Sequence, residues 1–197
     1  MNLIDSKKHI PWIVFEAKDW LDEHLKSNMK VFEWGSGGST FYFSKRVDEI
    51  VSIEYNKEWY SKVIEAISIE NIKNCKYFFI EPKRNFIAKF LPYHSSTYIS
   101  KTFKEYEGLF FNEYVKKIDQ FPDEYFDLIF IDGRSRSSCI AHSIKKIKRG
   151  GFLMLDNSER KLYESEMKKL NKYKRIDFFG HGPYIEEEWQ TSIWEIK

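Results

Sequence analysis

Residues 31–40 read VFEWGSGGST, and residues 50–56 read IVSIEYN. The first run opens with apolar residues around a single acid, Glu33, which is typical of a strand buried on both faces of a parallel sheet. Three glycines follow at positions 35, 37 and 38. Glycine accepts positive φ and has no Cβ, so the backbone can turn sharply and a ligand can approach its N–H groups. The pattern predicts a strand followed by a ligand-binding turn.

A helix and a second strand are expected after this turn. Ser39 and Thr40 can cap a helix that runs to about Val47, and residues 49–55 form the next strand. Its acid, Glu54, follows the first glycine by about twenty residues, which is the spacing of a carboxylate that binds ribose hydroxyls. The unit therefore predicts a nucleoside-binding site.

Two details bear on the choice of nucleotide. A dinucleotide fingerprint has a third glycine where this chain has Thr40, and it holds a pyrophosphate at the helix N-terminus. Glu33 would repel a diphosphate, but it could order the turn or attract a cationic ligand. S-adenosylmethionine, which carries a sulfonium and an ammonium, fits these residues better than NAD.

At these residues the chain resembles the class I S-adenosylmethionine-dependent methyltransferases. Their first motif is an acid before a glycine-rich turn, and their second strand ends in an acid. The resemblance implies a cofactor site made by Glu33, Gly35, Ser36, Gly37, Gly38, Ser39, Glu54, Tyr55 and Asp132.

The second half of the chain continues the alternation of strands and helices. Residues 125–132 read YFDLIFID and predict a buried strand, and a helix is expected over 135–147. Residues 148–151, KRGG, should end that helix, because cations and then glycine are common at helix C-termini. A strand over 152–155 ends in Asp156.

The chain closes with a helix to about Tyr173 and two strand-like runs, 175–179 and 191–196. The resembled family ends its sheet with such an antiparallel hairpin, and the similarity extends from about residue 28 to the C-terminus. We therefore expect an α/β fold of the Rossmann-like methyltransferase type. It would have a seven-stranded, mostly parallel sheet with helices on both faces and a C-terminal antiparallel hairpin.

Composition is that expected of a single domain over residues 1–197. No apolar run is long enough to span a bilayer, and the N-terminus lacks the pattern of a secretory signal. Cys75 and Cys139 are expected on a strand and a helix as packed thiols, which favours a cytoplasmic protein. The 32 basic and 30 acidic side chains give a net charge of +2, so neither nucleic acid nor a membrane is predicted as a partner.

One connecting segment is longer than this fold requires. After a third strand over 76–80, residues 82–108 show no clean periodicity, and connections of this length in compact domains are often lids. We predict that this insertion covers the active site and helps to set substrate choice; the alternative is a contact in a homodimer.

Asp132, Asp156 and Asn157 are expected together at the carboxyl ends of adjacent strands. Two carboxylates and an amide oxygen suit Mg²⁺ or another divalent ion. The same arrangement occurs in the catechol and caffeoyl-CoA type O-methyltransferases. That resemblance implies a metal that binds two neighbouring substrate oxygens and lowers a hydroxyl pKa.

This chain departs from that pattern at Ser135, where those enzymes carry a lysine that accepts the substrate proton. Asp132 and Asp156 could instead cap the helices that follow them. Without a metal, Asp132 or Asp156 could act as general base, with His181 as a further candidate.

Arg134, Arg136 and Arg160 would surround the acceptor, because arginine binds carboxylate, phosphate or sugar oxygens well; Arg134 is included among the catalytic candidates. The short sequence segments around Arg134 and Arg160 also resemble those of bacterial methyltransferase-like proteins, some from polysaccharide gene clusters. The resulting hypothesis is O-methylation of a small polyhydroxylated or anionic acceptor from S-adenosylmethionine, with Mg²⁺ as an open question. The alternatives are an NAD-dependent oxidoreductase and a non-catalytic binding protein with this fold.

Overall fold

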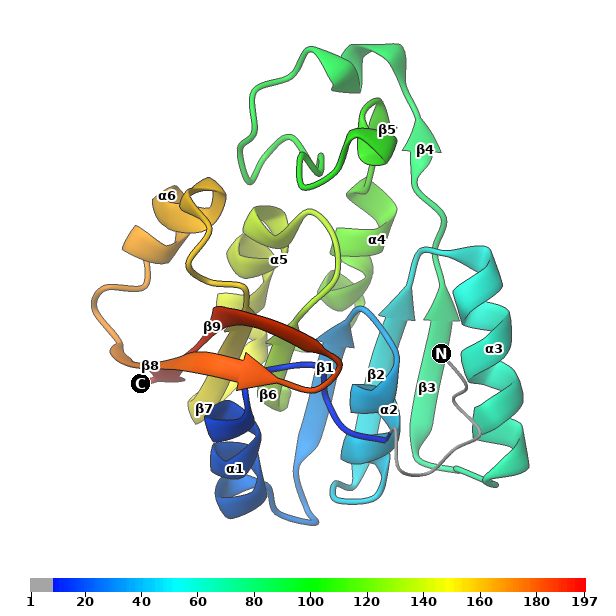
Figure 1. The fold of residues 1–197 in the computed structure, drawn as a ribbon, viewed down its shortest axis with the longest axis vertical. Helices are drawn as coiled ribbons and strands as arrows, with labels where there is room; N and C mark the ends of the chain where they lie inside the picture. Colours follow the sequence, from blue (N-terminus) through cyan, green and yellow to red (C-terminus); the bar gives the residue numbers. More distant parts are fainter. Residues whose placement is uncertain (1–8) are drawn as a thin grey trace.

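The computed structural model describes residues 9–197 and contains a seven-stranded sheet between two layers of helices (Figure 1). The sheet order is β3-β2-β1-β6-β7-β9-β8. Neighbours from β3 to β7 are parallel, whereas β9 is antiparallel to both β7 and β8. The strands are β1 (Lys30–Trp34), β2 (Glu49–Glu54), β3 (Cys75–Phe79), β6 (Phe126–Ile131), β7 (Ile147–Asp156), β8 (Lys174–Gly182) and β9 (Ile185–Ile196). This confirms the expected α/β fold with its C-terminal hairpin.

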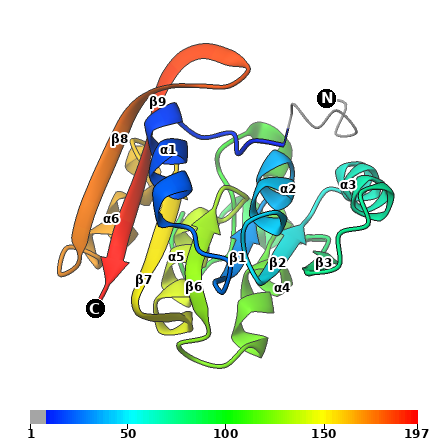
Figure 2. The same ribbon diagram turned by 90° about the horizontal axis from the view of Figure 1, so that it is seen from below.

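Helices cover both faces because alternate strand residues point to opposite sides of the sheet (Figure 2). Val31 packs in the cluster with α1, whereas the next residue, Phe32, packs in the cluster with α4 and α5. The helices are α1 (Phe15–His24), α2 (Gly38–Ser44), α3 (Lys57–Ile69), α4 (Asn112–Lys116), α5 (Arg136–Ser143) and α6 (Glu164–Lys168). Burial on both faces explains why the central parallel strands are mostly apolar.

Three helices end earlier than expected, and the one expected over 135–147 ends as an α-helix at Ser143. The helix after the glycine turn ends at Ser44 rather than near Val47, because the Asn74 side-chain amide donates to the carbonyls of both residues. The last helix was expected to reach about Tyr173 but ends at Lys168. There, i→i+3 bonds such as that from the Leu170 N–H to the Met167 carbonyl replace the helical pattern.

The prediction for residues 148–151 was wrong, because they belong to β7 instead of a helix end. Ile147 already pairs with Phe126, and Phe152 pairs with Leu128, so four residues bulge opposite Asp127. The Lys148 ammonium lies 2.9 Å from the Asp127 carboxylate, and Gly150 has φ of +79°. Lys148 therefore stabilises a bulge through Asp127, a residue of the neighbouring strand.

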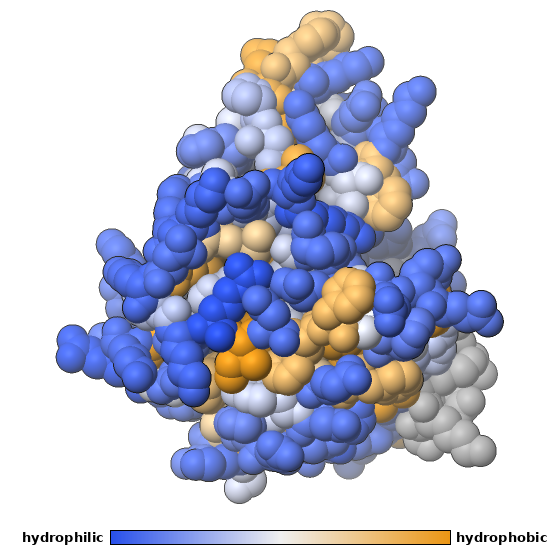
Figure 3. Space-filling view, turned by 60° about the vertical axis from the view of Figure 1, so that its left-hand side comes forward, coloured by the Kyte–Doolittle hydropathy of each residue, from blue (hydrophilic) through white to orange (hydrophobic). Residues whose placement is uncertain are grey.

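The insertion after β3 contains a small second sheet of β4 (Lys83–Arg84) and β5 (Leu109–Phe110), with 3₁₀ turns between them. It stands above the carboxyl ends of the parallel strands (Figure 1). Apolar side chains gather at its far tip (Figure 3), where Phe86, Ile87 and Phe90 are exposed. Across residues 9–197, the helices are too short or too polar to cross a bilayer.

Candidate functional site

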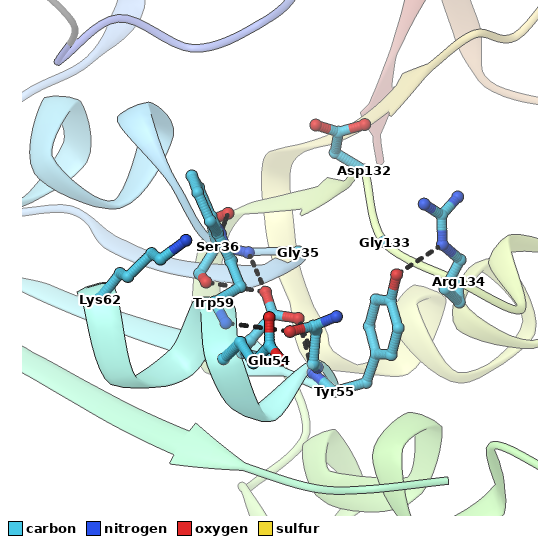
Figure 4. A pocket seen from close by; sticks show the side chains of 11 residues that line it. Gly35, Ser36, Glu54, Tyr55, Trp59, Lys62, Asp132, Gly133 and Arg134 are labelled. Atoms are coloured by element: carbon cyan, nitrogen blue, oxygen red, sulfur yellow. Dashed lines mark hydrogen bonds between the residues drawn. The ribbon is translucent and has the colours of Figure 1, made fainter. Parts of the chain in front are cut away.

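Two adjoining cavities lie at the carboxyl ends of the parallel strands. The first has a volume of about 400 Å³ and is lined by Gly35, Ser36, Glu54, Tyr55, Asn56, Glu58, Trp59, Lys62, Asp132, Gly133 and Arg134 (Figure 4). The second has a volume of about 550 Å³ and is lined by Trp12, Phe103, Asp132, Arg134, Arg136, Asp156, Asn157, Glu159, Arg160, Ile185, Glu187, Glu188 and Trp189. Asp132 and Arg134 belong to both, so a group bound in one cavity can meet a group bound in the other at these two residues.

Two glycine-containing turns meet at the floor of the first cavity. Gly35 has φ of +93°, and a Cβ there would lie 2.9 Å from the backbone nitrogen of Gly133. A Cβ on Gly133 would lie 1.9 Å from the hydroxyl of the buried Tyr114. Glycine is therefore required at both positions by the close approach of the β1–α2 and β6–α5 turns.

The Glu54 carboxylate forms a wall of the first cavity. Its Oε2 accepts from the Ser36 N–H at 3.2 Å and the Ser36 hydroxyl at 2.8 Å. Its Oε1 accepts from the N–H groups of Tyr55 and Asn56, each at 2.8 Å. Burial raises the pKa of Glu54, and these donors oppose the rise. The carboxylate is thus held rigidly beside the glycine turn, as the spacing predicted.

Glu33 lies behind the turn and lines neither cavity. It is fully buried, and its Oε1 accepts from the hydroxyls of Thr40 and, at 2.6 Å, Ser52. Burial raises its pKa to about 7. Of the two roles considered for Glu33, this geometry favours ordering of the turn over contact with a cationic ligand.

The other residues of the predicted cofactor set divide between the cavity and the helix behind it. Gly35, Ser36, Tyr55 and Asp132 line the first cavity. Gly37, Gly38 and Ser39 form the start of α2 and line neither cavity. These three residues therefore join the turn to α2 and do not face the cavity.

The first turn of α3 supplies residues that the sequence argument missed. Asn56 caps this helix, since its Oδ1 accepts from the Trp59 N–H at 2.9 Å. The Trp59 indole N–H donates to the Ser36 carbonyl at 2.8 Å, so its ring is fixed beside the glycine turn. Lys62, one turn further along, also reaches the cavity (Figure 4). An Asn two residues after Glu54, followed by an aromatic residue three positions later, was the signal that could have identified this wall.

Arg136 links the two acids proposed as metal ligands. Its Nη2 lies 2.8 Å from Oδ1 of Asp132, and its Nη1 lies 3.8 Å from Oδ2 of Asp156. Among residues 9–197 there is no group of three or more His, Cys, Asp or Glu side chains placed to hold a metal. The Arg136 guanidinium already pairs with both carboxylates, so the donor set does not fit a divalent ion, and we assign no step to Mg²⁺.

Neither acid caps a helix. Oδ1 of Asp156 accepts from the Trp189 indole N–H and the Thr191 hydroxyl, each at 2.8 Å. The N-cap of α5 is Ser135, whose side chain makes no capping bond and donates instead to Ser138. The capping alternative was therefore wrong, because strand β9 and Arg136 provide the partners of these carboxylates.

Asp132 and Asp156 differ in how much of each side chain is exposed to the cavities. The Asp132 side chain is 28% exposed and faces both cavities, whereas that of Asp156 is 5% exposed. Burial raises the pKa of both carboxyls; Arg136 opposes the rise at each, and the neighbouring Asp132 adds to it at Asp156. Asp132 is the carboxylate that a ligand can reach.

Arg134 projects between the cavities from the turn after β6. Its Nε donates to the Tyr55 hydroxyl at 3.1 Å (Figure 4). Its guanidinium carbon lies 4.5 Å from the ring centroid of Tyr106 and 5.3 Å from that of Phe103, both from the insertion. The insertion therefore fixes the position of this cation.

The remaining candidates lie at the rim. Arg160 and Asn157 line the second cavity, and the Arg160 guanidinium lies 3.7 Å from the Glu159 carboxylate. His181 lines neither cavity; its side chain is 56% exposed and its Nε2 lies 3.4 Å from Glu188. The structure thus separates His181 from Asp132, Asp156 and Arg134, which it brings together.

Comparison with known proteins gives matches in structure alone. No protein-family model and no curated sequence matches this chain. A protein of Streptococcus mutans assigned as a methyltransferase and solved with SAH shares 12% identity, with a TM-score of 0.62, covering 94% of this chain and 99% of its own.

Two further solved structures show the same likeness. A protein of Klebsiella pneumoniae assigned as an O-methyltransferase has a TM-score of 0.66 and 11% identity, over 98% of this chain and 86% of its own. An rRNA methylase of Streptococcus thermophilus has a TM-score of 0.60 and 11% identity, over 92% of this chain and 95% of its own. These similarities establish the fold, which is that of the class I methyltransferases.

Proposed function

We propose that this chain, with its class I methyltransferase fold, transfers a methyl group from S-adenosylmethionine to an oxygen of a small polyhydroxylated or anionic acceptor, such as a sugar derivative. The observation that carries the proposal is the Glu54 carboxylate at the wall of the first cavity, held beside the Gly35 turn. A cavity of about 400 Å³ is within the range of small-ligand sites. Fold alone does not select a reaction, so the proposed function depends on the residues of this site.

Glu54 would bind the ribose hydroxyls. Four donors already fill the acceptor positions of its two oxygens, so a ribose hydroxyl must replace one of them. The Ser36 hydroxyl is the donor most easily replaced, because the Tyr77 hydroxyl lies 2.7 Å away as its second partner. The three backbone N–H groups would keep the carboxylate in place.

S-adenosylmethionine supplies an electrophilic methyl group on a positively charged sulfur. The residues of the chain then have to hold the acceptor oxygen in line with that methyl group. They also have to accept the proton that the acceptor hydroxyl loses. Asp132 is the best placed base, because it lines both cavities and Arg136 binds only its Oδ1. One oxygen of Asp156 accepts hydrogen bonds from Trp189 and Thr191, so we assign Asp156 a structural role.

The second cavity would hold the acceptor. Its walls come from distant parts of the chain, including Phe103 of the insertion and Ile185 of the hairpin. We infer that residues 82–108 act as the cover of this cavity and contribute to acceptor choice. Arg134 would bind an oxygen of the acceptor at the junction.

A large RNA substrate is a poorer match to the second cavity, although one structural neighbour is an rRNA methylase. The cavity has a volume of about 550 Å³, which is within the range of sites for small ligands. NAD is disfavoured by Thr40, which is buried against Glu33 where a dinucleotide site has glycine.

The test is calorimetric titration of the purified protein with S-adenosylhomocysteine, NAD and Mg²⁺. We expect S-adenosylhomocysteine to bind in the micromolar range, and Glu54→Ala to weaken it about thirtyfold, the loss of about one charge-assisted hydrogen bond. Glu65→Ala, an exposed acid on α3, is the matched control and should bind as the wild type does. Preference for NAD, or equal binding by Glu54→Ala, would overturn the proposal. Binding of the homocysteine compound without turnover on any acceptor would favour the non-catalytic alternative.

A further inference from the structure

Arg134 and Arg136 lie two residues apart, yet only one of them is satisfied by the protein. Arg136 is 4% exposed and donates to the carbonyls of Gly133, Asp132 and Asp156 as well as to the Asp132 carboxylate. It is a structural cation whose three guanidinium nitrogens all donate to groups of the protein.

Arg134 has a different set of contacts. Within residues 9–197 it makes no ion pair; the nearby Asp132 is paired with Arg136, and Arg160 is paired with Glu159. Its one hydrogen bond runs from Nε to the Tyr55 hydroxyl, which leaves both Nη groups without a hydrogen-bond acceptor in the described chain. Because Arg134 is only partly exposed, water cannot fully replace a partner anion.

Aromatic rings hold this guanidinium in one orientation. Tyr106 and Phe103 lie against it, and the Tyr55 hydroxyl, which binds Nε, also lies 2.8 Å from the Tyr106 hydroxyl. A guanidinium with Nε fixed and its two Nη groups open presents two parallel donors, the geometry that binds carboxylate or phosphate in a bidentate manner.

We propose that Arg134 is the specificity-determining residue for the acceptor and that the acceptor carries a carboxylate or phosphate group bound by its two Nη groups. This inference rests on the proposed methyl transfer and narrows its substrate class from polyhydroxylated or anionic compounds to anionic ones. The methionine carboxylate of the cofactor is the other possible source of an anion. The acceptor is favoured because Phe103 lines the second cavity and not the first.

The experiment titrates the full-length protein, with and without saturating S-adenosylhomocysteine, with glucuronate, glucose and inorganic phosphate. We expect glucuronate or phosphate to bind the wild type, glucose to bind at least tenfold more weakly, and Arg134→Gln to lose at least tenfold in affinity for the anion. Arg134→Lys should lose nearly as much, because lysine cannot form the two parallel bonds. Arg149→Gln, which removes an exposed arginine on β7, is the matched control and should be unchanged.

Three results would overturn the inference. They are binding of neither anion, equal binding of glucose, and a tenfold loss of S-adenosylhomocysteine affinity in Arg134→Gln without loss of anion binding. The last result would assign Arg134 to the cofactor carboxylate. If the wild type fails to bind S-adenosylhomocysteine, the proposed function fails, while the anion titration still decides whether Arg134 forms an anion site.

Discussion

The two cavities are built in different ways. The walls of the first come mainly from turns that directly follow β1, β2 and β6, and most of its contacts involve backbone groups close in sequence to Gly35, Glu54 or Gly133. The second is closed by Trp12, Phe103 and Ile185, three side chains from separate segments outside the parallel strands. The first cavity is therefore a property of the fold, whereas the second depends on which side chains the added segments bring to it.

Gly133→Ala should have the largest effect, because it disrupts the turn shared by both cavities. The new methyl would overlap the buried Tyr114 hydroxyl, and overpacking of this kind costs about 3 kcal/mol in free energy of unfolding. Urea denaturation measures the loss. Gly180→Ala, where the nearest atoms belong to the Glu16 carboxylate, is the control and should change stability by less than about 1 kcal/mol. Equal stability of the two variants would contradict the close approach of the Tyr114 hydroxyl to Gly133.

Glu33→Gln should change the pH dependence of stability and leave the second cavity intact. The folded-state pKa of Glu33 is raised from 4.5 to about 7, so its favourable contribution is complete below pH 4.5 and is lost as the pH rises through 7. The shift of about 2.5 units corresponds to roughly 3 kcal/mol as an upper bound. The variant should gain stability over the wild type at pH 8, measured by denaturation at several pH values. Curves that stay parallel from pH 5 to 8, as expected for the exposed control Glu65→Gln, would contradict the buried, protonated state.

Phe103→Ala should act on the second cavity alone. Loss of the ring beside the Arg134 guanidinium should weaken glucuronate binding about fourfold, from a cation–π interaction of about 0.5–1 kcal/mol, with no change for S-adenosylhomocysteine. The comparison is Phe86→Ala, which removes a ring that is 78% exposed in the same insertion and lines neither cavity. Similar losses from both variants would mean that the insertion acts as a whole and not through Phe103.

Ser36→Ala should give the smallest effect and act on the first cavity alone. Its hydroxyl occupies an acceptor position on Glu54 that a ribose hydroxyl would need, so its removal should tighten S-adenosylhomocysteine binding by about threefold, a fraction of one hydrogen bond. Tyr77→Phe removes the hydroxyl that Ser36 would bind once a ribose hydroxyl replaces it on Glu54. This variant should therefore weaken S-adenosylhomocysteine binding slightly. Weaker binding by Ser36→Ala would mean that Ser36 itself contacts the cofactor.

The order of strands and helices, together with the family resemblance at the glycine turn, was sufficient to predict the fold, and the spacing of Glu54 predicted its place beside that turn. Apolar strands, glycines and the acid about twenty residues later act through neighbours in the same βαβ unit, so their pattern can be recognised in sequence. The same reasoning failed for residues 148–151, because the basic side chain of Lys148 is held by Asp127 on the adjacent strand. Local helix-ending signals carry no information about that partner.

The acids at the strand ends also show what sequence can predict and what only the tertiary structure decides. Sequence alone placed Asp132 and Asp156 at the carboxyl ends of neighbouring strands, but it could not show that Arg136 lies between them or that Trp189 and Thr191 bind Asp156. It also named Arg134 without distinguishing it from Arg136. Only the tertiary structure separates a cation satisfied by backbone carbonyls from one stacked on the insertion with both Nη groups open, because their partners come from segments far away in the chain.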